Sequence, residues 1–184
     1  LHKLWINFET SRYSENLYVE NSVLKQMYTE QYVVNKVGEK LPVGISHVDA
    51  MEGKLLYDLV YAYPEQRGPK TLEVGMAFGT TALFICQALN DRQIAGKDGG
   101  RMGHHVSIDP NQSEQWSGVG KLNLQKAGLF EKYAEVREEF SHAALPKALE
   151  KGEKYDLIFI DGAHAEEFVH VDVYFSSLLL DKGG

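Results

Sequence analysis

The sequence of 184 residues contains a single cysteine, Cys86. One thiol cannot form an internal disulfide bond, and Cys86 lies in the apolar run 82–86, so we expect a small buried side chain rather than a reactive nucleophile. A chain of this length can bury roughly 70% of its unfolded surface, so it needs neither disulfide bonds nor a structural metal to hold a core. A reducing, cytoplasmic compartment is therefore expected.

Long apolar runs and clusters of basic residues are also absent. No apolar stretch reaches the roughly 18 residues that a membrane span needs, and residues 1–13 lack the apolar region of a secretory signal. Acidic residues outnumber basic ones by 26 to 19, which gives a formal net charge of −7. We therefore expect neither nucleic acid nor a membrane as a partner, and a small molecule as the ligand.

Glycine and proline divide the chain near Gly68 and Pro69 into a leader, residues 1–67, and a core, residues 68–184. Apolar residues recur at helical spacing in 22–37 and 48–61, which predicts two helices in the leader. The leader is also rich in aromatic residues. This composition leaves open a cap over the core, a wall of a substrate pocket, a homodimer surface, or ordinary packing of helices on a sheet.

The core alternates short apolar runs with longer amphipathic segments. The runs 71–74, 105–108, 133–137 and 156–160 predict strands, and 80–89, 113–127, 141–150 and 165–180 predict helices. This alternation predicts right-handed βαβ units and an α/β fold of the Rossmann-like type, a doubly wound parallel sheet. The run 156–160 is apolar on both alternating faces, which is typical of a central parallel strand. The glycine-rich segment 90–103 is predicted to be a flexible surface loop.

The end of the first core strand reads Leu-Glu-Val-Gly-Met-Ala-Phe-Gly-Thr-Thr at positions 72–81. Gly75 and Gly79 allow a tight turn, and a helix that begins near Gly79 presents free N–H groups to an anion such as a carboxylate. Glu73 can accept a hydrogen bond from an ammonium group, so a ligand with both an amine and a carboxylate fits this strand end. The dinucleotide fingerprint is not met because Ala77 stands where glycine is required. A turn that serves packing alone is the alternative.

The second core strand ends at Asp109. In a doubly wound sheet, a carboxylate at the end of the neighbouring strand is where a ribose diol is bound. An N-cap for the following segment is the alternative role.

Four motifs in order carry a family resemblance. They are Leu-Glu-Val-Gly-x-x-x-Gly-Thr-Thr at 72–81, Ile-Asp-Pro at 108–110, Tyr-Asp-Leu-Ile-Phe-Ile-Asp-Gly-Ala-His at 155–164 and Leu-Leu-Leu-Asp-Lys-Gly-Gly at 178–184. Together they resemble class I S-adenosylmethionine (SAM)-dependent methyltransferases, and in detail the small-molecule O-methyltransferases, over about residues 45–184. The resemblance implies the class I fold, SAM as cofactor and methyl transfer to an oxygen of a small-molecule acceptor.

The resemblance also implies a role for individual residues. Residues around the methionine portion of SAM would be Glu73, Gly75, Ala77 and Gly79, with Thr81 bonding its carboxylate. Asp109 would take the ribose hydroxyls. Ser141 and His142 stand where the family places adenine contacts, with Phe140 either flanking the ring or packing in the core.

The end of the fourth strand, Asp161-Gly162-Ala163-His164, is implied to carry the chemistry. In the metal-dependent relatives an Asp at this position is a ligand of Mg²⁺ or another hard divalent cation, which orients the acceptor hydroxyl. His164 stands where those relatives often carry a lysine as general base, and an imidazole can accept a proton at neutral pH. A metal-free enzyme with His164 as base is the alternative, as is a structural role for Asp161 as an N-cap.

The motifs supply only the first four strands of the seven that the resemblance implies. A fourth strand with a bare apolar edge invites aggregation, so we expect the natural chain to continue past Gly184 or a partner to cover that edge. Two other functions stay open. One is a noncatalytic binding or assembly module with this fold, and the other is a nicotinamide-dependent oxidoreductase, which Ala77 and Glu73 disfavour.

Overall fold

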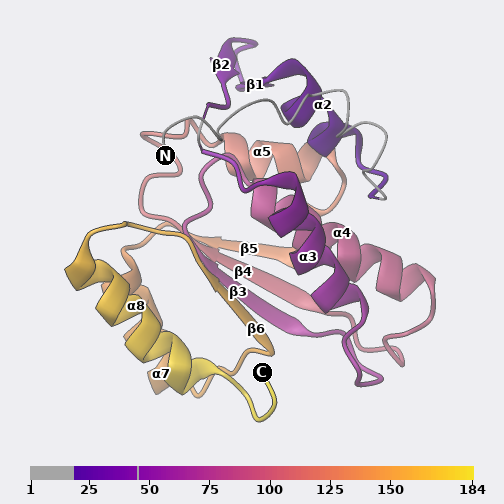
Figure 1. The fold of residues 1–184 in the computed structure, drawn as a ribbon, viewed down its shortest axis with the longest axis vertical. Helices are drawn as coiled ribbons and strands as arrows, with labels where there is room; N and C mark the ends of the chain where they lie inside the picture. The colour runs from indigo at the N-terminus through magenta and orange to yellow at the C-terminus, as the bar shows by residue number, and fades with distance from the viewer. Residues whose placement is uncertain (1–18, 45) are drawn as a thin grey trace, which may run out of the picture.

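A computed structural model describes residues 19–44 and 46–184 (Figure 1). Residues 1–18 of the leader, with the aromatic residues Trp5, Phe8, Tyr13 and Tyr18, lie outside the described residues. The elements, in chain order, are α2 (Ser22–Glu30), β1 (Tyr32–Val34), β2 (Lys40–Pro42), α3 (Ala50–Tyr61), β3 (Lys70–Val74), α4 (Thr80–Ile94), β4 (His104–Ile108), α5 (Val119–Lys126), α6 (Phe130–Tyr133), β5 (Ala134–Arg137), α7 (Ser141–Glu150), β6 (Leu157–Ile160) and α8 (Glu166–Leu179).

The main sheet is parallel and has the strand order β5-β4-β3-β6. Successive strands are joined through helices, and the order reverses beside β3, so the predicted doubly wound α/β architecture is confirmed. β6 lies at the edge of this sheet rather than at its centre, and its four residues are only half-buried. Its apolar pattern is that of an interior strand, but among the described residues only β3 pairs with it.

Two helix predictions need correction. The first leader helix ends at Glu30, where Gln31 adopts a left-handed conformation (φ +57°), and residues 32–42 form the antiparallel hairpin β1-β2 instead of continuing to residue 37. The helix predicted over 113–127 begins only at Val119. The second leader helix, α3, is confirmed and begins with a capping box between Asp49 and Glu52. Within the described ranges, no helix has the length and apolar character that crossing a membrane requires.

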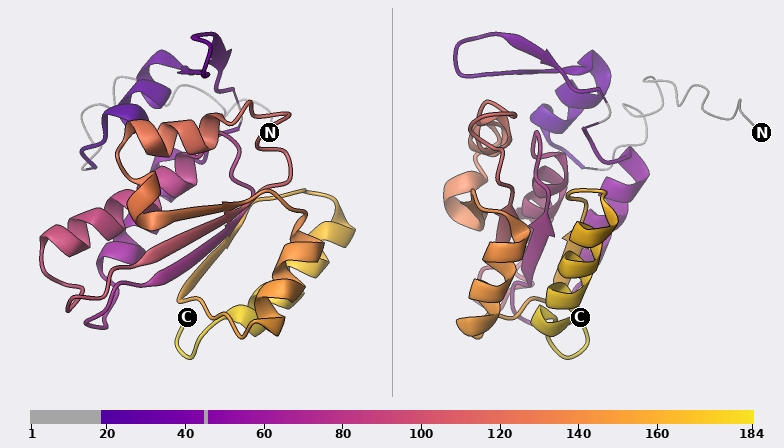
Figure 2. Two further views of the ribbon diagram at one scale, coloured as in Figure 1. Left: turned by 180° about the vertical axis from the view of Figure 1, so that it is seen from behind. Right: turned by 90° about the vertical axis from the view of Figure 1, so that its left-hand side faces the viewer.

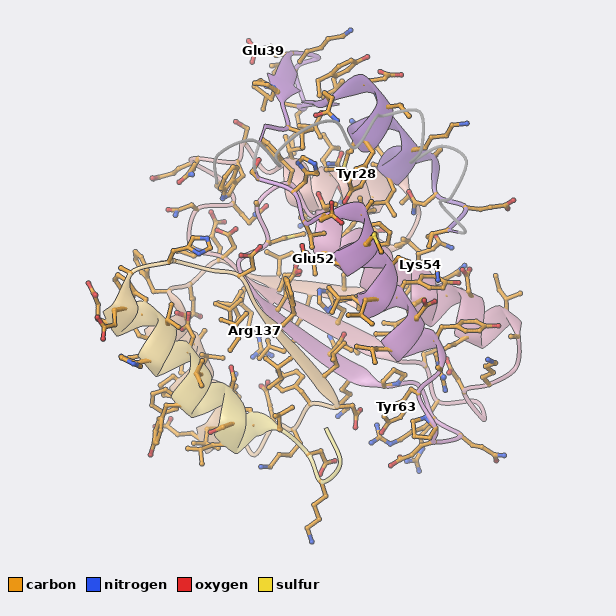
Figure 3. All side chains as sticks on the ribbon, viewed as in Figure 1. Tyr28, Glu39, Glu52, Lys54, Tyr63 and Arg137 are labelled. Carbon is orange, nitrogen blue, oxygen red and sulfur yellow. The ribbon has the colours of Figure 1, made fainter. Side chains whose placement is uncertain are left out.

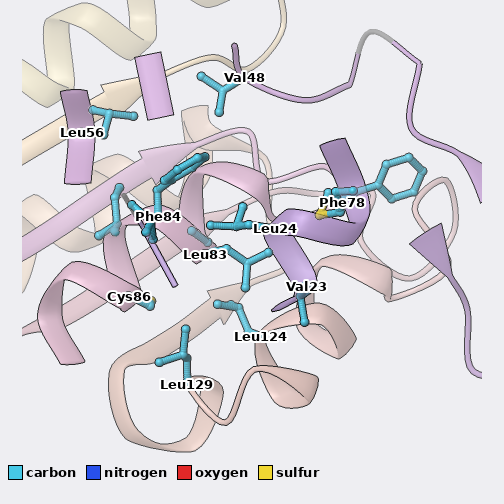
Figure 4. Packing of buried hydrophobic residues seen from close by; sticks show 14 of the residues in the cluster. Val23, Leu24, Val48, Leu56, Phe78, Leu83, Phe84, Cys86, Leu124 and Leu129 are labelled. Carbon is cyan, nitrogen blue, oxygen red and sulfur yellow. The ribbon is translucent and has the colours of Figure 1, made fainter. Parts of the chain in front are cut away.

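Helices cover both faces of the sheet (Figure 2). On one face, α2, α3, α4 and α5 enclose the larger apolar cluster, which includes Leu24, Leu56, Phe84 and the fully buried Cys86 (Figure 4). Burial is the largest cause of the raised pKa of the Cys86 thiol, which agrees with its predicted packing role. On the other face, α7 and α8 pack against the apolar side chains of β3 and β4.

At the edge of the sheet where the strands begin, the Arg92 side chain links several segments of backbone. The Arg92 side chain, 1% exposed, donates hydrogen bonds to the carbonyl oxygens of Tyr61 (2.7 Å) and Tyr63 (2.9 Å) and pairs with Asp98. Figure 3 labels Tyr63 at this edge. Segment 90–103 was predicted to be a surface loop, but its first residues continue α4 and it contains this buried ion pair.

Candidate active site

The loops that follow β3 and β6 touch backbone to backbone at the edge where the strands end. The Asp161 amide donates to the carbonyl oxygen of Val74 (2.8 Å). Gly75 has φ +91°, and a Cβ on it would lie 2.2 Å from the carbonyl oxygen of Asp161. Only glycine satisfies both the conformation and this approach. Two of the predicted site segments, 75–79 and 161–164, are thereby brought together.

Asp109, which directly follows β4, holds the same loop through hydrogen bonds. Its Oδ2 accepts hydrogen bonds from the backbone amides of Met76 (3.1 Å) and Ala77 (2.8 Å), and its Oδ1 accepts from the Asn111 amide. Gln112 completes the brace by donating from Nε2 both to the Ala77 carbonyl oxygen (2.8 Å) and to Asp109 Oδ2 (3.0 Å). The carboxylate, 4% exposed, therefore fixes a loop in which Ala77 has the left-handed φ of +47°.

The start of α4 offers an anion site. The N-cap is Gly79, which has no side chain to cap the helix, so the first amides of this 15-residue helix are left for another acceptor. Thr81 is buried at this helix start, and its expected bond to a carboxylate stays a prediction. The adjacent Thr80 hydroxyl is also buried and has no hydrogen-bond partner among the described residues.

Glu73 is placed differently from the loop residues. It is completely buried on the face of the sheet that packs against α4, with Oε1 3.4 Å from Nε2 of His105. His105 is held by the hydroxyls of Thr71 (2.8 Å from Nδ1) and Ser107 (3.2 Å from Nε2). Within the described part of the chain, neither carboxylate oxygen of Glu73 makes a hydrogen bond. Its role as an acceptor for an ammonium group stays a prediction.

Asp161 and His164 lie together in the turn after β6. Asp161 Oδ1 is 3.8 Å from His164 Nε2, and the His164 side chain is 88% exposed. The described residues contain no group of three or more His, Cys, Asp and Glu side chains that could hold a metal ion. Asp161 thus has one nearby titratable neighbour and no set of ligands around it.

Ser141 and His142 form the first turn of α7. This turn lies beside α8, the helix that follows the β6 turn. Phe140, 57% exposed, stacks on the His142 ring with centroids 5.4 Å apart. Phe168 of α8 faces the same ring at 6.4 Å. Phe140 therefore belongs to a surface cluster of rings and not to the core.

The sequence pattern does not single out three residues that carry buried polar atoms without a partner among the described residues: Thr80, Gln112 and Asp172. Thr80 adjoins Gly79 at a predicted helix start, which could have identified it. Asp172 occupies the buried face of α8 with Ser176 and Leu179, at spacings of four and seven residues, so a helical projection could have found an acid on an apolar face. Gln112 carries no comparable pattern.

Comparisons with solved structures show the same fold. An O-methyltransferase from Bacillus cereus in complex with SAH matches with a TM-score of 0.66 and 20% identity over 94% of this chain and 67% of that chain. The O-methyltransferase TomG from Streptomyces achromogenes, in complex with SAM, matches with a TM-score of 0.60 and 21% identity, over 91% of this chain and 66% of that one. The SAH-bound Podospora anserina methyltransferase PaMTH1 matches with a TM-score of 0.63 and 15% identity, over 100% and 71%. The chain spans about two thirds of the length of these proteins and about half (52%) of cofactor-bound Rv0187 from MTB, another solved structure that it matches.

A search of curated proteins found no match. A family model described as a methyltransferase domain matches residues 72–184, which is more than half of the chain and includes all four strand ends described above. The chain therefore belongs to the methyltransferase domain family and has the Rossmann-like fold of the class I methyltransferases.

Proposed function

We propose that this chain binds SAM and transfers its methyl group to an oxygen of a small-molecule acceptor. The observation that carries the proposal is the convergence of three strand ends: the 75–79 loop is bonded to Asp109 on one side and contacts the Asp161 turn on the other. Ligands of doubly wound sheets bind at this edge, beside the reversal in strand order. The family match supports methyl transfer and does not favour the oxidoreductase or the noncatalytic module.

The unpartnered groups at this edge fit the cofactor. A carboxylate would bind at the uncapped start of α4, where the Thr80 hydroxyl is buried without a partner. Asp109 holds the loop through Oδ2, and Oδ1, which accepts from the Asn111 amide, would use its remaining lone pair for a ribose hydroxyl. Phe140 and His142 offer flat surfaces for an aromatic base. When bound, SAM supplies a methyl group already activated by its sulfonium.

The acceptor's proton would pass to His164. Its imidazole is exposed and lies beside the Asp161 carboxylate, which would orient it. Because the transferred methyl group is already electrophilic, the remaining tasks of the protein are to align the acceptor and to remove its proton. The described residues do not fit a divalent metal at Asp161, so no step is assigned to one.

The test separates cofactor binding from chemistry. SAM affinity would be measured by calorimetry, and turnover would be followed as release of S-adenosylhomocysteine with a panel of phenols, catechols and aliphatic alcohols. His164→Ala is expected to lower turnover about a hundredfold or more while SAM affinity changes less than twofold. His170→Ala on the exposed surface of α8 is the matched control. Unchanged turnover in His164→Ala would refute its assignment as the base, and absence of SAM binding in the unaltered chain would refute the proposed function.

A further inference from the structure

Gln112 is a buried amide that the proposed function leaves without a role. It follows Asp109 by three residues, in the segment between β4 and α5, and is 3% exposed. Its Nε2 lies within hydrogen-bond distance of Asp109 Oδ2 and of the Ala77 carbonyl oxygen. Both of these atoms are acceptors, so the NH₂ group of the amide must face them, and the orientation of the side chain is thereby fixed.

The bonds on the two sides of Ala77 fix its conformation. The Ala77 amide donates to Asp109 Oδ2 (2.8 Å), and the Ala77 carbonyl oxygen accepts from Gln112 Nε2 (2.8 Å). The amide and the carbonyl group of one residue belong to different peptide planes, and φ and ψ are the rotations between those planes. Asp109 and Gln112 therefore hold both planes around Ala77, whose left-handed φ of +47° is unfavourable for a residue with a Cβ.

Gln112 also joins this loop to the carboxylate that follows β4. Its Nε2 donates to Asp109 Oδ2 (3.0 Å), which accepts from the Met76 and Ala77 amides as well. One NH₂ group thus bonds both the 75–79 loop and Asp109. In the proposed function the loop binds the methionine portion of SAM and Asp109 binds the ribose, so Gln112 lies where the two halves of the cofactor site are joined.

The backbone of Gln112 is anchored without its side chain. The Gly118 amide donates to the Gln112 carbonyl oxygen (2.6 Å). The next residue, Ser113, donates from its amide (2.6 Å) and its hydroxyl (2.7 Å) to the carboxylate of Glu138, just after β5. The place of residue 112 therefore does not depend on the side chain that it carries, and a substitution there tests the NH₂ group itself.

We propose that Gln112 is a positioning residue that holds the methionine half of the SAM site in place relative to the ribose half. This inference rests on the proposed function, because it takes the 75–79 loop and Asp109 as the two halves. Gln112 acts through Ala77 and Asp109 and does not touch the cofactor. A ligand that spans both halves should therefore depend on Gln112 more than a ligand that occupies one half.

The test compares two such ligands. Dissociation constants are measured by calorimetry for S-adenosylhomocysteine, which spans both halves, and for 5′-methylthioadenosine, which lacks the amino-acid end. Gln112→Met removes the NH₂ group with a side chain of similar length. It is expected to weaken the binding of S-adenosylhomocysteine about tenfold or more. Binding of 5′-methylthioadenosine should weaken less than about threefold, because Asp109 keeps its three backbone amide donors.

Gln87→Met is the matched control. Gln87 is a half-buried glutamine in the middle of α4, and its Nε2 donates to Asp91 Oδ1 (2.8 Å). The exchange therefore removes the same kind of bond without changing the loop after β3. Both dissociation constants should stay within about twofold of those of the unaltered chain.

The remaining outcomes separate this inference from the proposed function. If S-adenosylhomocysteine is weakened no more than 5′-methylthioadenosine, the inference is overturned and the proposed function stands. If the unaltered chain does not bind S-adenosylhomocysteine, both fail. Gln112→Leu takes the place of Gln112→Met if the latter does not fold. Failure of both variants to fold would show that Gln112 is needed for folding, which also overturns its assignment as a positioning residue.

Discussion

The two edges of the parallel sheet differ in whether their buried polar groups have hydrogen-bond partners. Where the strands begin, Arg92 is surrounded by carbonyl oxygens and Asp156 is bonded by Arg67, Tyr63 and the Lys70 amide. Where the strands end, Thr80, Gln112 and Asp172 each keep a buried polar atom with no partner among the described residues. Asp98 Oδ2 is an exception at the first edge, and His47, Glu73 and Ser176 also carry buried atoms without a partner among the described residues.

We interpret this contrast as a division between an edge that stabilises the fold and an edge that binds a ligand. Buried polar groups in folded proteins are nearly always bonded, so unpartnered groups gathered at one edge call for a ligand or a mechanical role there. Saturated groups at the opposite edge hold the structure together. Variants at the first edge should therefore change the free energy of unfolding, and variants at the second should change cofactor affinity.

The largest expected effect is at Arg92. In Arg92→Met, Asp98 would be left as an unpaired buried acid and the carbonyl oxygens of Tyr61 and Tyr63 would lose their donor. We expect the free energy of unfolding in urea to fall by about 3–5 kcal/mol. Arg101→Met, at an exposed position after the turn that follows α4, is the control. A loss below about 1 kcal/mol would contradict the interpretation that the polar groups at this edge stabilise the fold.

Asp156 tests the same edge through pH. Burial raises the pKa of its carboxyl group, but hydrogen bonds from Arg67, the Lys70 amide and Tyr63 outweigh burial and lower the pKa below its ordinary value of 3.8. Because the pKa is lower in the folded state, this stabilisation is fully present above the ordinary pKa and is lost as the pH falls through the folded-state pKa.

Asp156→Asn is therefore expected to be less stable than the unaltered chain by about 2 kcal/mol at pH 7. That difference should shrink towards zero as the pH is lowered below about 4, when the unaltered carboxyl group protonates. Urea unfolding of both proteins at pH 7, 5, 4 and 3 gives the difference directly. A difference that is independent of pH would show that the ion pair with Arg67 contributes nothing.

The sequence predicts the edge where the strands end better than the edge where the strands begin, and the reason is physical. Strand ends are visible as the points where apolar runs stop, and parallel strands bring those points to one edge, so the meeting of Gly75, Asp109 and Asp161 followed from the pattern alone. Arg92 bonds mostly to backbone carbonyl oxygens, and every residue type carries one. Its acceptors therefore leave no trace in the sequence.

One local prediction was wrong because a short apolar run suits two structures, and another stays a prediction. Residues 32–34 are apolar in a way that suits either a helix or a strand, and the left-handed turn at Gln31 decides for the hairpin. Glu73 is predicted to bind the cofactor from its place near a strand end. Alternation along β3 places it in the layer under α4, beside His105, and its role stays a prediction. The alternation of residues along a strand determines which face of the sheet each side chain occupies. It does not determine which side chains of other elements lie there.

The smallest expected effect distinguishes two adjacent hydroxyls at the other edge. The family resemblance implies that Thr81 bonds the SAM carboxylate, whereas the unpartnered buried hydroxyl is that of Thr80. Thr80→Val removes an unbonded polar group, so the free energy of unfolding should stay the same or rise. If that hydroxyl binds the carboxylate, affinity for S-adenosylhomocysteine should fall about fivefold, or about 1 kcal/mol. Thr81→Val, measured beside it by calorimetry, is the matched control; a loss in Thr81→Val alone would return the role to Thr81 and leave Thr80 as a tolerated defect, which would weaken the contrast between the edges.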